Sequence, residues 1–310
     1  MAVVPQRVMR RVFLWASRQP RLYLWARRHG RRLGAFRFVA GETLDECVRV
    51  LHRLTADGFR TNTTLLGEGV RDAETAMGVV TAYLQILDRL AAEGLPTNIA
   101  LKLTHLGLDL GEDVAYRNLR RIVARAAERR TFVRIDMEES HRVDATLRIY
   151  RRLREDGYDN VGAVVQAYLY RSERDLESLL PLRPNLRLVK GAYLEPPEVA
   201  YPRKADVDRA YVRLMERMLA DGGYTAVATH DERIIARAIA FAQTRRIPPD
   251  RFEFQMLYGV RPRLQADLVR RGYRVLVATP FGTEWFPYFM RRLAERPANV
   301  GFVLRSLLRR

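Results

Sequence analysis

The chain has 310 residues, 48% of them hydrophobic, which is enough for one sizeable core and a length that single β/α barrels reach. Its only cysteine, Cys47, excludes an internal disulfide, and no apolar run approaches the roughly 18 residues of a membrane span, so we expect a cytoplasmic protein. The formal net charge of +18 suggests by itself a nucleic acid or an anionic membrane surface as partner.

The chain begins with a basic segment. No acidic residue precedes Glu42, whereas ten arginines do: Arg7, Arg10, Arg11, Arg18, Arg21, Arg27, Arg28, Arg31, Arg32 and Arg37. Apolar and aromatic residues lie between them, which predicts a basic helical leader over residues 1–35, divided at Pro20. We expect these helices to pack on the barrel wall. The alternative is peripheral contact with the inner membrane surface.

After the leader, short apolar runs typical of strands alternate with helix-period segments. The eight runs are 59–65, 98–102, 132–136, 161–167, 186–190, 225–229, 252–257 and 273–279. Turn signals separate the units at Asp57-Gly58, Glu93-Gly94, Asp156-Gly157, Gly222-Gly223 and Arg271-Gly272. Eight alternations predict a (β/α)8 barrel over residues 36–310, in a single domain with the leader. An open doubly wound sheet is the alternative, disfavoured because no G-x-G-x-x-G follows a strand.

Polar residues fall where most of these strands end, and a barrel of this kind builds its site at that rim. They are Glu68, Lys102, Asp136, Gln166, Arg187, Lys190, His230 and Gln255. Each also has an ordinary structural interpretation: ion pairing for Lys102 and Arg187, helix capping for Asp136, a core histidine, or a solvated glutamate. The two glutamines lie inside apolar runs, where an unpaired amide costs about 1–3 kcal/mol, so both need partners. Their joint placement favours a functional site. We expect no metal, because the five histidines are scattered and Cys47 has no partner cysteine.

Four motifs resemble those of the proline dehydrogenase family in its short, monofunctional bacterial form. They are LVKGAY at 188–193, ATHD at 228–231, FQMLYG at 254–259 and YFMRRL at 288–293, and the likeness runs from about residue 36 to the C-terminus. The resemblance implies a distorted barrel with a C-terminal helix over the strand ends and FAD as cofactor. It also implies oxidation of L-proline to 1-pyrroline-5-carboxylate, with electrons passed to a membrane quinone.

The resemblance also implies roles for single residues. Asp136 and Arg187 match catalytic positions, and Lys102, Arg291 and Arg292 match residues that grip the substrate carboxylate, a suitable task for ammonium and guanidinium groups. Leu257, Ala278 and Tyr288 complete the expected substrate pocket, and Glu68 matches a gate residue that pairs with Arg291. The expected FAD contacts are Met137, Gln166, Arg187, Lys190, Gly191, Ala192, Thr229, His230, Gln255 and Glu295.

One position departs from the family pattern. Ala278 stands where the eighth strand normally brings a tyrosine that packs on the substrate ring. Either the pocket accepts a bulkier ring such as 4-hydroxyproline, or another aromatic, Tyr258 or Phe281, fills the space. Three rival interpretations of the whole chain are a flavin barrel of the methylenetetrahydrofolate reductase kind, a degenerate barrel without activity, and a basic scaffold that binds nucleic acid. No base-stacking or groove-reading motif supports the last, so we expect no nucleic-acid partner.

Overall fold

A computed structural model describes residues 19, 23, 35–221 and 223–295, with residues 35 and 291–295 described by their backbone alone. Eight parallel strands close into a barrel in chain order. They are β1 (Arg60–Leu65), β2 (Asn98–Leu101), β3 (Val133–Ile135), β4 (Val161–Gln166), β5 (Asn185–Val189), β6 (Tyr224–Ala228), β7 (Phe252–Leu257) and β8 (Val275–Phe281). The predicted barrel is therefore confirmed, and the open-sheet alternative is wrong.

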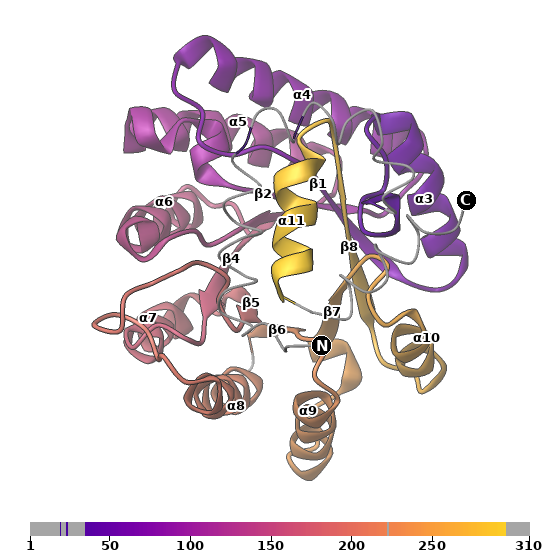
Figure 1. Cartoon of the computed structure of the whole chain (residues 1–310), viewed down its shortest axis with the longest axis vertical. Helices are drawn as coiled ribbons and strands as arrows, with labels where there is room; N and C mark the ends of the chain where they lie inside the picture. Colours follow the sequence, from indigo (N-terminus) through magenta and orange to yellow (C-terminus); the bar gives the residue numbers. More distant parts are fainter. Residues whose placement is uncertain (1–18, 20–22, 24–34, 222, 296–310) are drawn as a thin grey trace, which may run out of the picture.

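Helices surround the barrel, and one more crosses its end (Figure 1). They are α3 (Leu44–Ala56), α4 (Ala73–Ala92), α5 (Glu112–Glu128), α6 (Val143–Glu155), α7 (Ser172–Leu179), α8 (Lys204–Ala220), α9 (Glu232–Thr244), α10 (Pro262–Arg270) and α11 (Trp285–Glu295). Local chemistry begins several of them: Thr43 and Glu46 form a capping box at α3, and Asp72 caps α4.

The eighth strand differs from its predicted bounds. We expected residues 273–279, but β8 runs from Val275 to Phe281 and passes through Pro280. Its pairing with β7 ends at Ala278, whereas its pairing with β1 continues to Phe281. Pro280 therefore has one partner strand, a setting that tolerates its missing N–H.

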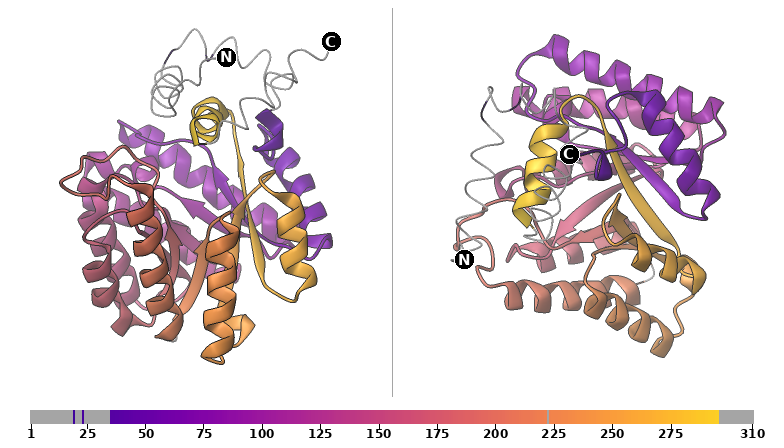
Figure 2. Two further views of the ribbon diagram at one scale, coloured as in Figure 1. Left: turned by 60° about the horizontal axis from the view of Figure 1, so that its bottom comes forward. Right: turned by 45° about the vertical axis from the view of Figure 1, so that its right-hand side comes forward.

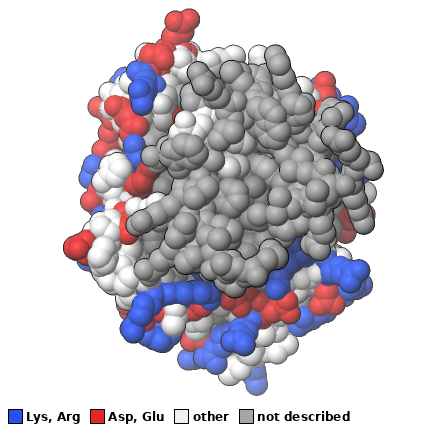
Figure 3. All heavy atoms as spheres, in the orientation of Figure 1, with Lys and Arg blue, Asp and Glu red and all other residues white. Residues whose placement is uncertain are grey.

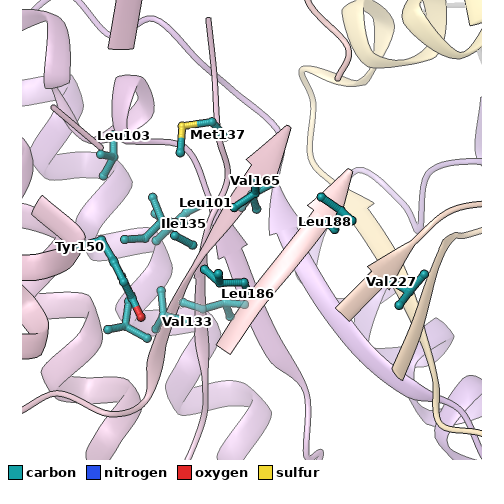
Figure 4. Packing of buried hydrophobic residues seen from close by; sticks show 14 of the residues in the cluster. Leu101, Leu103, Val133, Ile135, Met137, Tyr150, Val165, Leu186, Leu188 and Val227 are labelled. Atoms are coloured by element: carbon teal, nitrogen blue, oxygen red, sulfur yellow. The ribbon is translucent and has the colours of Figure 1, made fainter. Parts of the chain in front are cut away.

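The main core lies between the barrel and its surrounding helices. Figure 4 shows part of it, where Leu101 and Ile135 lie near Tyr150 of α6, and Val165 and Leu188 continue the layer along β4 and β5. Each of these five side chains is at most 5% exposed. Alternate residues on the strands face the barrel interior instead, because side chains of a strand alternate between its two faces.

A second, smaller apolar cluster fixes α11. Phe38 and Val39 pack there with Trp285, Phe286 and Phe289, and each is at most 5% exposed. Figure 2 shows α11 lying over one end of the barrel. The expected C-terminal helix over the strand ends is thus present. Most of the expected leader lies outside the described residues.

Three described residues, at positions 19, 23 and 35, belong to that leader. Tyr23 is helical, and its N–H donates to the carbonyl of Gln19 at 3.0 Å. The Tyr23 hydroxyl donates to Glu284 Oε1 at 2.9 Å, and its ring meets Phe286 edge-on. At this point the leader packs on α11 over the end of the barrel, and not on the barrel wall as we expected.

Candidate active site

The floor of the barrel mouth lies at the carboxyl ends of the strands. Seven partly exposed residues form it, and each lies in or just after a different strand. They are Thr64, Lys102, Asp136, Val189, Ala228, Leu257 and Ala278. Parallel strands bring their carboxyl ends to one rim, which is why residues far apart in the chain meet here. The helix α11 crosses above this floor (Figures 1 and 2).

An ion pair lies at the floor. Arg187 Nη1 donates to Asp136 Oδ1 at 2.7 Å, and their side chains are 11% and 27% exposed. The backbone N–H of Asp136 donates to the carbonyl of Leu101 at 2.8 Å, which fixes the residue just beyond β3. Asp136 caps no helix: the nearest caps are Glu139 and Arg142. The two predicted catalytic residues therefore contact each other.

Both buried glutamines have partners, as the cost of an unpaired amide required. Gln166 Nε2 donates to the carbonyl of Glu138 at 2.7 Å. Gln255 Oε1 accepts from Arg187 Nε, and Gln255 Nε2 donates to Glu253 Oε1 at 2.6 Å. The partners are protein groups, so these amides help to shape the floor.

Lys102, just after β2, is also paired. Its ammonium donates to Glu68, the predicted gate residue, in a short ion pair. Arg291, the gate partner expected from the sequence, lies in α11, and its side chain is outside the described residues, as are those of Arg292 and Glu295. In the described part of the mouth, Glu68 therefore holds the cation expected to grip a carboxylate.

The expected cofactor residues gather on the side of β4 to β7. Lys190 Nζ contacts Asp208 and Asp231, the latter at 3.2 Å. Burial opposes ionisation of Asp231, but Lys190 outweighs it and lowers the pKa of this carboxyl. His230 Nε2 accepts the N–H of Leu257 at 2.9 Å, so this nitrogen carries no proton and ties the end of β6 to that of β7.

The loop after β5 approaches its neighbour closely at Gly191. This residue has φ +113°, and a Cβ here would lie 2.1 Å from the ring of Tyr168. Glycine is required on both counts. Lys190 and Ala192 are thereby held at the rim, where the sequence predicted them, while Met137 packs into the core and is 8% exposed.

The substrate side carries the departure at Ala278. Ala278 pairs with Leu257 across β7 and β8, and both are partly exposed. Neither proposed substitute aromatic fills the space, since Phe281 is 3% exposed within the core and Tyr258 packs against the same cluster. Tyr288, on α11, packs against the second cluster.

Sequence reasoning missed two buried carboxylates beside the site. Glu138 accepts from the N–H and hydroxyl of Thr104 at 3.1 and 2.6 Å, and its pKa is raised by burial. Glu253 lies 3% exposed in the barrel interior. The sequence signal was available for Glu253, because polar residues at 253 and 255 alternate with apolar ones along β7. Among the described residues no cluster could hold a metal ion.

Comparison with known proteins decides the family. A family profile described as proline dehydrogenase matches residues 47–305. The chain belongs to the proline dehydrogenase family. Proline dehydrogenase 1 of Bacillus subtilis (strain 168) is 43% identical over 98% of this chain and 100% of its own length. Proline dehydrogenase of Deinococcus radiodurans is 44% identical over 97% and 98%.

A solved structure of the family agrees with the fold. The crystal structure of proline utilization A (PutA) from Bdellovibrio bacteriovorus, inactivated by N-propargylglycine, superposes with a TM-score of 0.79 at 27% identity. The match covers 84% of this chain and 32% of that much longer protein. A unit similar in fold to this chain therefore also occurs within a longer protein.

The residues at the mouth fit the flavin that this family implies. Lys190 and Arg187 supply positive charge, and the residues of the floor are partly exposed. This donor set suits an anionic, planar ligand with hydrogen-bond acceptors. Among the described residues no helix is both long and apolar enough to span a membrane.

Proposed function

We propose that this chain is an FAD-dependent dehydrogenase that oxidises L-proline to 1-pyrroline-5-carboxylate and passes the electrons to a quinone. The observation that carries the proposal is the Arg187–Asp136 pair on the barrel floor, with Lys102 after the strand next to the one that Asp136 follows. Family membership and relatives at 43–44% identity support the reaction. The proposal treats leader and barrel as one catalytic domain.

The residues have distinct tasks in this scheme. Lys102, with Arg291 and Arg292 of α11, holds the substrate carboxylate, and this clamp fixes which ring carbon faces the cofactor. When bound, the flavin supplies the acceptor for the hydride. Arg187 places a fixed positive charge on the floor, which favours an anion there. Asp136 orients Arg187 through their ion pair. It is also the carboxylate that we assign to accepting a proton from the substrate amine.

The site residues bind FAD in this proposal. Lys190, Gly191 and Ala192 follow β5, and Thr229 and His230 follow β6. Gln166, Gln255, Met137 and the α11 residue Glu295 complete the set. A quinone acceptor is a membrane molecule, so we propose a cytoplasmic protein that touches the inner membrane surface through its basic leader.

The test is an absorbance spectrum of the purified protein, before and after anaerobic addition of L-proline. We expect yellow protein whose flavin bands bleach with proline, because the half-reaction needs no second substrate. Colourless protein that cannot be reconstituted with FAD would contradict the cofactor. Yellow protein whose flavin bands bleach neither with proline nor with its ring analogues would contradict the substrate class.

A second candidate substrate follows from Ala278. This residue is partly exposed on the floor, and neither Phe281 nor Tyr258 replaces the family's tyrosine. A ring substituent therefore has room, and we propose 4-hydroxyproline as the alternative substrate. Turnover of proline and trans-4-hydroxyproline should be compared in the native protein and in Ala278→Tyr. We expect the substitution to shift preference toward proline; a native protein with little activity on hydroxyproline excludes this candidate.

A further inference from the structure

Glu253 is a buried carboxylate to which the proposed function gives no task. It lies on β7, 3% exposed, on the face of the strand that points into the barrel. Its Oε1 accepts from Gln255 Nε2 at 2.6 Å, and its Oε2 accepts from the Tyr224 hydroxyl at 3.0 Å. Arg60, half exposed at the start of β1, is 3.8 Å away. A buried carboxylate is costly unless paired, so its retention needs a reason.

The hydrogen bonds of Glu253 continue to the floor of the mouth. Gln255 Oε1 accepts from Arg187 Nε, and Arg187 Nη1 donates to Asp136. Four side chains from β7, β5 and the end of β3 thus form one chain of contacts. It starts inside the barrel at Glu253 and ends at the Asp136 carboxylate.

The chemistry of the two ends determines how Gln255 is oriented. A carboxylate only accepts hydrogen bonds, and a guanidinium only donates them. The amide of Gln255 stands between them, so its NH2 must face Glu253 and its oxygen must face Arg187. If residue 253 were neutral, Arg187 alone would set the orientation of the amide, and Gln255 would lose the charged acceptor that holds its NH2 in place.

The charge of Glu253 matters as well as its shape. Arg134 lies 3% exposed within the barrel and donates to the carbonyls of Ala163 and Asn185 at 3.0 and 2.7 Å. Burial, and then the charge of Arg187, lowers the pKa of Arg134 to about 9. Two guanidinium groups therefore repel each other inside the barrel, and Glu253 is a buried negative charge that opposes this.

We propose that Glu253 is a positioning residue for the reaction: through Gln255 it fixes the Arg187 guanidinium on the barrel floor, and its charge limits how strongly the floor favours an anion. The inference rests on the proposed function, because it assigns Arg187 a task there. The role requires no contact between Glu253 and the substrate. The glutamate acts only through its neighbours.

A double-mutant cycle tests the positioning. Glu253→Gln keeps the shape and removes the fixed polarity, and Gln255→Met cuts the same link with the carboxylate in place. We expect each to lower kcat about ten-fold with KM for proline within about two-fold, and the double variant to fall no further. Tyr224→Phe removes the other partner of Glu253 and is the control, with kcat near that of the native protein.

The flavin midpoint potential separates this role from a merely structural one. Glu253→Gln removes a buried negative charge, so we expect its potential to move in the positive direction, while Tyr224→Phe leaves it unchanged. Far-UV circular dichroism and flavin content establish folding. If Glu253→Gln is poorly folded, Gln255→Met alone must show the ten-fold loss of kcat expected for a broken charge-assisted contact.

Three results would overturn the inference: native kcat and potential in Glu253→Gln, native kcat in Gln255→Met, or additive losses in the double variant. Bleaching of the native protein by proline is established first. If the native protein does not bleach, the proposed function fails. If it bleaches and Glu253→Gln behaves like it, only the role of Glu253 fails.

Discussion

At the scale of single residues, the Asp136–Arg187 contact is the feature on which activity most depends. Asp136→Ala leaves Arg187 without its charged acceptor, and hydrogen bonds to charged groups contribute about 1.5–3 kcal/mol. We therefore expect kcat/KM for proline to fall about ten- to hundred-fold. Steady-state kinetics measure this. Glu112→Ala, which breaks the exposed contact with Arg148, is the matched control and should change kcat/KM less than about two-fold.

His105 gives a prediction about pH and stability. It is 7% exposed behind the loop at Gly67, and burial, followed by the charge of Lys102, lowers its pKa from 6.5 to about 4. Below pH 6.5 the unfolded chain gains a proton that the folded protein refuses, so stability falls as the pH drops from 6.5 to 4. The loss is about 3 kcal/mol, at about 1.4 kcal/mol per pH unit.

Urea unfolding at pH 7 and at pH 4.5 measures the effect of His105. We expect His105→Gln to lose less stability than the native protein between these two values, because glutamine does not titrate. His52→Gln is the control: His52 is on the surface, paired with Glu93. Equal pH dependence in His105→Gln and the native protein would show that His105 is not the source.

Some residues of the site could be predicted from sequence and others could not. Asp136 follows β3 and Arg187 lies in β5. The carboxyl ends of both strands are at one rim, so the barrel brings the two residues together. The pairing of Lys102 with Glu68 does not follow, because it depends on the path of two loops. Glu253 was missed for a different reason: in a polar barrel interior, a buried carboxylate in a strand looks like any other alternating polar residue.

At the scale of elements, six helices end in the same way. The residue after the C-cap has positive φ and closes the last turn, and it is Gly58, Gly94, Gly157 or Gly272 after α3, α4, α6 and α10. The turn signals in the sequence marked all four positions. After α5 and α9 the same position is arginine, Arg130 with φ 53° and Arg246 with φ 54°. Sequence gave no sign of these two ends, because arginine rarely adopts this conformation.

These two arginines lead to a prediction about helix ends. The backbone of Arg246 is left-handed, which is strained for a residue with a side chain, and its side chain is exposed. Because Arg246→Gly removes the strain, we expect the free energy of unfolding to rise by about 0.5–1 kcal/mol. Gly157→Ala is the reverse experiment, and nothing lies near the Cβ it would add, so only the backbone effect operates. Stability should fall by a similar amount. Urea midpoints compare the variants, and a lower midpoint in Arg246→Gly would contradict the argument.

At the scale of the whole molecule, alternation of strand and helix predicted the architecture, and pairing of β1 with β8 completed it. That pairing joins residues more than two hundred positions apart, from Arg60 with Leu276 to Leu65 with Phe281. No local pattern indicates such a contact; the count of eight strands implies it. The position of α11 was predicted from the family resemblance, and the contacts of Trp285 with Phe38 and Glu42 explain it only once the fold is known.

Charge is also a property of the whole molecule, and it is unevenly distributed. Ten of the arginines precede Glu42, so more than half of the net +18 belongs to the first forty-one residues. Around the part of the described surface that Figure 3 shows, by contrast, basic and acidic side chains are interspersed. A general attraction of the protein to an anionic lipid surface would depend on its total charge. Attachment to that surface through the leader would depend on where the charge lies.

Vesicle binding distinguishes these two cases. We expect the protein to sediment with vesicles that contain anionic lipid, and to be released by salt, because each basic residue near the surface contributes about 1 kcal/mol. The triple substitution of Arg7, Arg10 and Arg11 by glutamine should weaken binding about ten-fold or more. The control replaces Arg245, Arg251 and Arg270, exposed residues at the opposite end of the barrel from the mouth, with the same loss of charge. Equal weakening by both triples would mean that total charge, not the leader, holds the protein to the lipid.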